Sequence, residues 1–164
     1  MKPIALLLML GASAAAAAAP PPRIVAASGR WAALAGTRQC DAASLSLLPA
    51  SKTRLQGRAS LTFDRGARHG QFAAALSQPV ASGASVMLTI DDESFLLVAR
   101  GLGAWSRGPA QEASIVAALR RATRMRIEGR SLRGLRFIDR YDLAGAPTAI
   151  DAAAACAQAL LANR

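Results

Sequence analysis

The chain has 164 residues, a formal net charge of +10 and a hydrophobic fraction of 52%. This length fits one domain, and an apolar fraction this high excludes disorder over the bulk of the chain. One histidine and two cysteines disfavour a histidine-based catalytic triad and a zinc site of the usual ligand count, and an aromatic content of 4% disfavours the stacking surfaces of single-stranded nucleic-acid binders.

The N-terminal segment has the pattern of a secretory signal peptide. Lys2 supplies the positive charge, residues 4–10 are apolar, and residues 14–19 are a run of alanines that satisfies the small-residue rule for cleavage. We expect cleavage after Ala18. The alternative is a membrane anchor, which the three prolines at 20–22 disfavour because they would end a spanning helix.

The expected organisation is a signal peptide over residues 1–18, a linker over 19–28 and a single β-rich domain over 29–164. No later segment is apolar over the length that a membrane-spanning helix needs, so no transmembrane segment is expected in the mature chain. These expectations place the protein in the periplasm or outside the cell.

Short segments of alternating polarity follow the linker and predict strands. They cover residues 29–34, 44–48, 58–63, 71–77, 84–90 and 95–99. The period then changes to 3.6 residues over 109–122, which predicts a helix with a proline in its first turn. Two more strands are expected over 125–129 and 135–143, followed by a final helix over 148–162.

This order of elements predicts a mainly β fold. We expect an antiparallel sheet or sandwich with two helices, one after the central strands and one C-terminal, and an α+β arrangement is the alternative. Gln78 and Pro79 are expected to break one strand, and Gly101 and Gly103 to bound a loop that carries Trp105.

Export changes how the two cysteines are interpreted, because disulfides persist in oxidising compartments. The only intramolecular pairing is Cys40 with Cys156, and Cys156 falls on the stripe of the final helix that also carries Ala149, Ala153 and Leu160. A bond there would tie the front of the domain to its last helix and stabilise it by about 4–5 kcal/mol on the chain-entropy model. The alternative is two separate buried thiols.

The positive charge is carried almost entirely by arginine. The densest basic stretch contains Arg130, Arg133, Arg136 and Arg140, of which Arg136 and Arg140 would share a strand face. Such a face could bind the phosphate or sulfate groups of acidic envelope components, whereas nucleic acid is not an expected partner. The alternative is a solvated sheet face whose charge reflects genomic base composition.

Other polar residues favour structural roles. His69 is expected in a solvated loop, and the acidic run 91–93 in a charged hairpin turn, since it lacks the spacing of a calcium loop. Trp105 beside Arg107 is either a packed loop anchor or a ligand-stacking residue, and packing is favoured because large aromatics are scarce. No catalytic residue, cofactor or metal-ligand set is predicted.

The layout of these segments resembles the invasion-associated locus B family of exported Gram-negative bacterial proteins. The resemblance rests on Gly29-Arg30-Trp31 followed nine residues on by Cys40, and on segments 58–63, 86–91, 104–107, 115–119 and 141–145. It implies a β-rich, non-enzymatic protein of the periplasm or envelope, in a family named for a role in host-cell invasion in some pathogens.

Three functions follow. The first is a non-catalytic exported envelope protein with a structural or binding role. The second is an arginine-rich binder of anionic envelope lipid or polysaccharide. The third is a small secreted hydrolase or hydrolase inhibitor, although no paired carboxylates in the sequence support it. The identity of the ligand and any role in host invasion stay open at this point.

Overall fold

The computed structural model describes residues 21–64, 66 and 68–162, so the expected signal peptide and its cleavage site lie outside the described residues. The elements in chain order are β1 (Arg23–Ser28), β2 (Trp31–Ala35), β3 (Gln39–Leu45), β4 (Arg58–Asp64), β5 (His69–Val80), β6 (Val86–Ile90), β7 (Glu93–Trp105), α1 (Pro109–Arg121), β8 (Arg124–Arg130), β9 (Arg136–Asp142) and α2 (Ala146–Ala162). Within the described part of the chain, neither helix is long and apolar enough to span a membrane.

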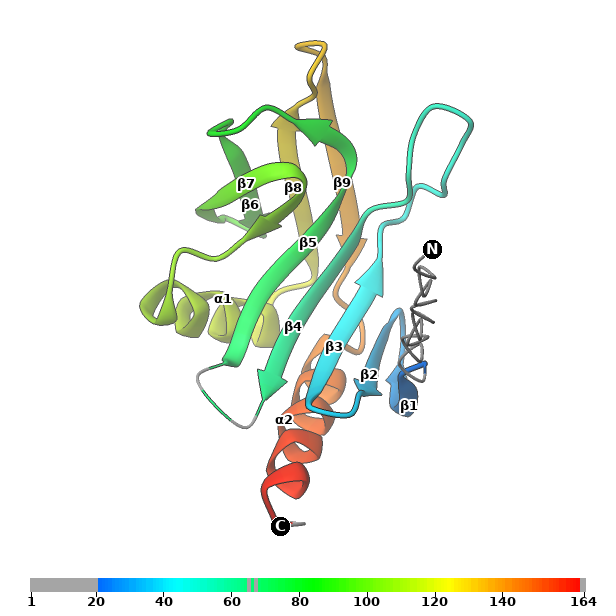
Figure 1. Cartoon of the computed structure of the whole chain (residues 1–164), viewed down its shortest axis with the longest axis vertical. Coiled ribbons are helices and arrows are strands. Elements are labelled where there is room, and N and C mark those ends of the chain that lie inside the picture. The colour runs from blue at the N-terminus through cyan, green and yellow to red at the C-terminus, as the bar shows by residue number, and fades with distance from the viewer. Residues whose placement is uncertain (1–20, 65, 67, 163–164) are drawn as a thin grey trace, which may run out of the picture.

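The strands form one antiparallel sheet in the order β1-β2-β3-β4-β5-β7-β6-β8-β9, which confirms the expected mainly β fold with two helices. The sheet curls because β7 changes partners along its length. Its first residues, from Glu93 to Leu97, pair with β6, and those from Gly101 to Trp105 pair with β5. Gly101 has a φ of 58°, a conformation that favours glycine, at the bend between the two halves. Figure 1 shows the long β5 curving towards its end, with the bent β7 beside it.

The curl brings the last strand back towards the middle of the sheet. The N–H of Leu132, in the β8–β9 turn, donates to the carbonyl of Pro79 on β5 at 2.9 Å. The N–H of Leu47, in the β3–β4 loop, donates to the carbonyl of Arg140 on β9 at 2.8 Å. The half of the sheet that contains β6, β8 and β9 therefore folds over the end of β5.

Two strands continue through residues that were expected to break them. β5 runs past Pro79 to Val80, and β7 runs through the glycines to Trp105. Proline is tolerated because the β5–β7 register shifts between Ala75 and Val80, so that no regular ladder bond is required there. Gly101 and Gly103 therefore lie within a bent strand and do not bound a loop. Glycine is common at sharp bends in strands as well as in loops, so the sequence pattern did not distinguish the two.

The N-terminal boundary also differs from the sequence prediction. Residues 23–28, part of the expected linker 19–28, form β1 and pair with β2 through Ile24 opposite Leu34. The strand expected over 44–48 lies instead over Gln39–Leu45. The sequence analysis missed β1 because most of its side chains are exposed. An exposed edge strand is held mainly by backbone hydrogen bonds, and its sequence therefore need not alternate between apolar and polar residues.

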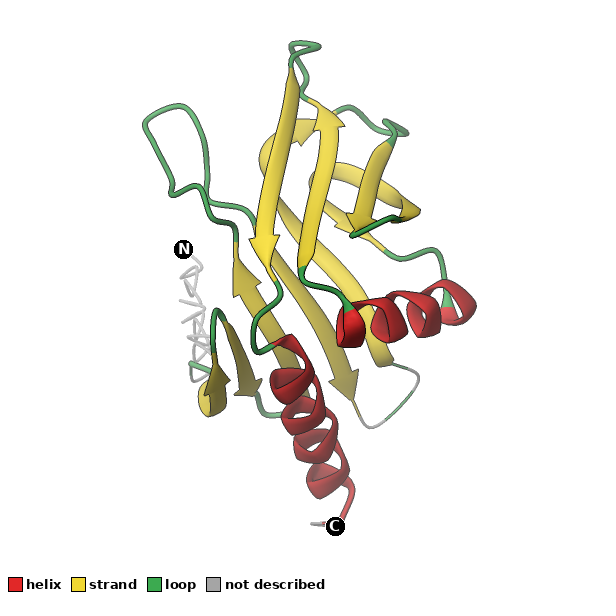
Figure 2. Cartoon of the chain, turned by 180° about the vertical axis from the view of Figure 1, so that it is seen from behind, coloured by secondary structure: helices red, strands yellow, loops and turns green. Residues whose placement is uncertain are grey.

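The helices cover the apolar surface of the sheet, as Figure 2 shows from behind. α2 packs against β1, β2 and β3, and α1 packs against β5. The predicted Cys40–Cys156 disulfide is confirmed: it joins β3 to α2, with the two Cα atoms 6.1 Å apart. Trp31, at the start of β2, is buried, and its indole N–H donates to the carbonyl of Asp142 at 3.0 Å.

Candidate functional site

The predicted arginines lie on the β8–β9 hairpin. The side chains that face away from the core include Arg126 and Arg130 on β8 and Arg136 and Arg140 on β9, while alternate residues of both strands are buried. Arg133 lies in the turn that joins the two strands and is also exposed. The structure thus places three of the four predicted arginines on one exposed face and the fourth at its end.

Two of the predicted arginines already have partners within the protein. Arg136 forms a bidentate salt bridge with Glu128. Its Nε donates to Oε1 at 2.8 Å, and its Nη2 donates to Oε2 at 2.7 Å. This hydrogen bonding lowers the pKa of the Glu128 carboxyl and raises that of Arg136. Arg130 donates from Nη1 to the carbonyl of Gly134 at 3.1 Å. These two side chains therefore contribute to the hairpin itself.

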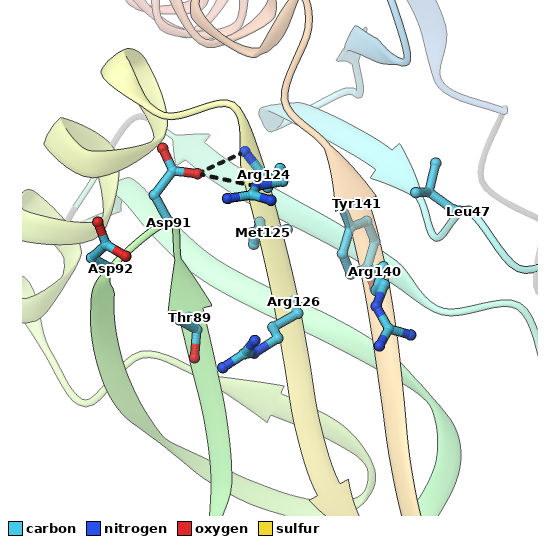
Figure 3. Close-up of a pocket in the computed structure, with 9 residues that line it drawn as sticks. All are labelled: Leu47, Thr89, Asp91, Asp92, Arg124, Met125, Arg126, Arg140 and Tyr141. Carbon is cyan, nitrogen blue, oxygen red and sulfur yellow. Dashed lines mark hydrogen bonds and ion pairs between the residues drawn. The ribbon is translucent and has the colours of Figure 1, made fainter.

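Arg126 and Arg140 differ from the other arginines of this face. They lie directly opposite each other in the β8–β9 register, and both are exposed. Among the described residues, neither has a carboxylate or carbonyl partner. Like charges directly opposite each other on antiparallel strands destabilise the pair. Figure 3 shows that the two side chains extend in different directions, that of Arg126 toward Thr89 of β6 and that of Arg140 along β9, so an anion held by both would draw the two guanidinium groups together.

A pocket of about 390 Å³ opens beside this pair, and Figure 3 shows its lining. It is lined by Leu47, Thr89, Asp91, Asp92, Arg124, Met125, Arg126, Arg140 and Tyr141. Thr89 of β6 pairs with Arg126 in the β6–β8 register, so its hydroxyl lies beside that arginine. The pocket thus combines two unpaired guanidinium groups, a hydroxyl and the apolar side chains of Leu47 and Met125.

Two carboxylates also line the pocket, those of Asp91 and the exposed Asp92, and the first of them has a structural role. Asp91 lies in the β6–β7 turn, where its carboxylate accepts hydrogen bonds from the backbone N–H groups of Thr123 and Arg124, both at 3.1 Å. Glu93 pairs with Arg121 of α1. The acidic run therefore forms the predicted charged hairpin turn, and it attaches that turn to the junction of α1 and β8.

A buried polar cluster lies beneath the pocket, and the sequence analysis did not identify it. The Asp139 side chain is fully buried: its Oδ2 accepts from the N–H of Ser77 at 2.9 Å, and its Oδ1 lies 3.7 Å from Nη2 of Arg54. Burial, and then the charge of Asp139, raise the pKa of Tyr141 above its usual range. A Cβ atom on Gly57 would lie only 2.8 Å from Oδ2 of Asp139, so glycine is required at this point of the β3–β4 loop.

The remaining candidates fall elsewhere. His69 is exposed at the start of β5, opposite Phe63. The expectation that Trp105 packs into the core is wrong: its side chain is 36% exposed and lines a second hollow together with Val98 and Arg107. Across residues 21–64, 66 and 68–162, no group of three or more His, Cys, Asp or Glu side chains is placed to hold a metal ion.

Arg126 and Thr89 are two of the pocket residues that the sequence analysis did not single out. Arg126 alternates with Met125 and Ile127 in a predicted strand, and this pattern could have placed it on the outer face. Its position opposite Arg140 depends on the register of the hairpin. Comparison with models of protein families, with curated proteins and with solved structures finds no match to this chain.

Proposed function

We propose that this chain is a non-catalytic exported protein of the cell envelope, and that it binds a phosphate-bearing envelope component between Arg126 and Arg140. The observation that carries the proposal is the direct opposition of two unpaired, exposed arginines at the edge of a pocket. Like-charged side chains that face each other are unfavourable in the free protein, so an anionic ligand gains both attraction and relief of repulsion.

Three features support the proposed compartment. The N-terminal segment has the pattern of a signal peptide. The Cys40–Cys156 disulfide is of a kind that persists in oxidising compartments. The layout of the mature chain resembles the invasion-associated locus B family, which implies an envelope protein without enzymatic activity.

The ligand chemistry follows from the arginines and their surroundings. A guanidinium group presents a planar fork of donors that matches two phosphate oxygens, and two such groups on neighbouring strands can hold one phosphate from both sides. The Thr89 hydroxyl beside Arg126 can donate a further hydrogen bond. Phosphate groups of this kind occur on lipid headgroups and on phosphorylated polysaccharides, and the experiment separates these sources.

The test compares the wild-type protein with a variant that carries Arg126→Gln and Arg140→Gln. Binding is measured to inorganic polyphosphate, to a phosphorylated polysaccharide and to vesicles that contain phosphatidylglycerol. We expect the double substitution to weaken binding to the phosphate probes at least tenfold. The matched control carries Arg120→Gln and Arg121→Gln, which remove the same charge from α1, where both side chains already pair with acids.

The control should bind within about twofold of the wild-type protein, since its arginines lie away from the pocket. Equal losses in the two variants would mean that only net charge matters and would overturn the proposed site. Failure of the wild-type protein to bind any of the phosphate probes would overturn the proposed function. Preference for one probe identifies the source of the phosphate group.

A further inference from the structure

Exposed leucines gather at one end of the molecule. The β8–β9 turn carries Leu132 and Leu135, each 66% exposed, and the β3–β4 loop carries Leu48 and Leu55, which are 46% and 53% exposed. Both segments project from the same end, at the top of Figures 1 and 2. An apolar side chain that is exposed singly is ordinary, but four on two segments that project from the same end of the molecule offer an interaction surface.

The charges around these leucines are all positive. The turn over residues 131–135 contains Arg133, and the loop over residues 46–57 contains Lys52, while Arg54 of the same loop is paired with the buried Asp139. Neither segment contains an aspartate or a glutamate, and the β5–β6 connection over residues 81–85 at the same end also has none. The acid on the adjoining strand, Glu128, is neutralised by its two contacts with Arg136.

We propose that this end of the molecule, the leucine tip, docks onto the surface of an anionic lipid bilayer. The leucine tip consists of Leu48, Leu55, Leu132 and Leu135 together with Lys52 and Arg133. Leucine side chains would enter the apolar edge of the bilayer, while the long basic side chains extend to the phosphate groups. The proposal deepens the proposed function and rests on it for the anionic chemistry of the partner.

The backbone supports insertion of these tips without unfolding. In the turn, the N–H of Ser131 donates to the carbonyl of Leu135 at 2.9 Å, and the N–H of Gly134 to the carbonyl of Ser131 at 2.8 Å. The base of the β3–β4 loop is closed by the N–H of Ser46, which donates to the carbonyl of Gly57 at 2.8 Å. Backbone N–H and C=O groups that are hydrogen-bonded within the turn do not lose hydrogen bonds to water when the turn enters the bilayer. The free-energy cost of moving the leucines out of water is therefore lower.

The arginine pair lies on strands that end at this tip. Arg140 is on β9, which begins directly after the turn, and Leu47 of the β3–β4 loop lines the pocket beside it. A bilayer contacted by the leucine tip would bring lipid phosphates towards the outer face of β8 and β9. The docking surface and the arginine pair would therefore act on the same partner through different chemistry.

The experiment measures co-sedimentation with vesicles that contain phosphatidylglycerol and with vesicles of phosphatidylcholine alone. We expect the wild-type protein to bind the anionic vesicles and the Leu132→Thr plus Leu135→Thr variant to bind them at least tenfold more weakly. The matched control carries Ile24→Thr and Leu102→Thr, two exposed apolar residues on β1 and β7, and should bind within about twofold of wild type. Unchanged thermal unfolding would establish that the variants fold.

A second measurement reports insertion directly. A Leu132→Trp variant should show a blue shift of its emission with anionic vesicles and quenching by brominated lipid, because the indole would lie in the apolar edge of the bilayer. Neither effect is expected when Trp replaces Leu102 on β7. Absence of both effects at position 132, or equal vesicle binding by the leucine variant and the wild-type protein, would overturn the docking surface.

The polyphosphate assay separates this result from the proposed function. The leucine variant should bind polyphosphate as the wild-type protein does, because its arginine pair is intact. If the leucine variant loses vesicle binding but still binds polyphosphate, the result supports the docking surface. If the wild-type protein binds polyphosphate but not vesicles, the docking surface is overturned and the proposed function is not. If the leucine variant also loses polyphosphate binding, the assignment of different roles to the leucines and the arginines is overturned.

Discussion

Asp139 of β9 accepts a hydrogen bond from the backbone N–H of Ser77 on β5 at 2.9 Å, although these two strands are not neighbours in the sheet. The contact joins the last strand to the middle of the sheet, and the Asp139 side chain is fully buried there. Arg54, from the β3–β4 loop, provides the opposing charge at 3.7 Å. One carboxylate thus connects three segments that are far apart in the sequence.

Removal of this carboxylate should destabilise the fold. We expect Asp139→Ala to lower the free energy of unfolding by about 3–5 kcal/mol, because the Ser77 N–H loses its acceptor and Arg54 loses its opposing charge. Asp139→Asn should lower it by less, since the amide oxygen can still accept from Ser77. Urea unfolding of the oxidised protein measures both changes. An Asp139→Ala variant as stable as the wild-type protein would contradict this role.

Tyr141 should remain protonated to unusually high pH. Burial and the nearby charge of Asp139 raise its pKa above the usual value of about 10, and because it is the single tyrosine, ultraviolet titration reports on it alone. Its phenol ionises at lower pH in the unfolded chain than in the folded protein. The contribution to stability is therefore complete below about pH 10 and is lost as the pH rises above that value.

Tyr141→Phe provides the control for that titration. Among the described residues the Tyr141 hydroxyl has no hydrogen-bond partner, so its removal should leave stability at neutral pH the same or slightly higher. The variant should lose less stability above pH 10 than the wild-type protein. A wild-type phenol that titrates at its ordinary pKa in the folded protein would contradict the buried environment.

The disulfide should make a large contribution to stability. We expect Cys40→Ser plus Cys156→Ser to lower the free energy of unfolding by about 4–5 kcal/mol, because the bond closes a loop with a sequence separation of 116 residues. A thiol assay on unfolded, unreduced protein should detect no free thiol. Two reactive thiols, or a double variant with wild-type stability, would disprove the expectation.

Export predicts the first residue of the mature protein. With cleavage after Ala18, N-terminal sequencing of protein from a periplasmic extract should begin at Ala19. A substitution that places a charge in the apolar segment, such as Leu7→Arg, should block export and leave the full-length chain in the cytoplasm. A wild-type protein that retains Met1 in the cytoplasm would contradict this prediction.

The sequence alone determined the features that depend on local patterns. Alternation placed Arg136 and Arg140 on one strand face, since successive side chains of a strand point to opposite sides. The 3.6-residue period located both helices within a few residues. The Cys40–Cys156 bond followed from the presence of only two cysteines in a chain expected to be exported.

Only the tertiary structure decided which residues meet across the sheet. Arg126 lies opposite Arg140 because of the β8–β9 register, and Asp139 reaches Ser77 because β7 bends at Gly101 and the sheet curls. Register and curvature arise from the packing of many distant side chains against α1 and α2. A period-2 pattern specifies which face a side chain occupies, but it contains no information about the residue that the side chain will face.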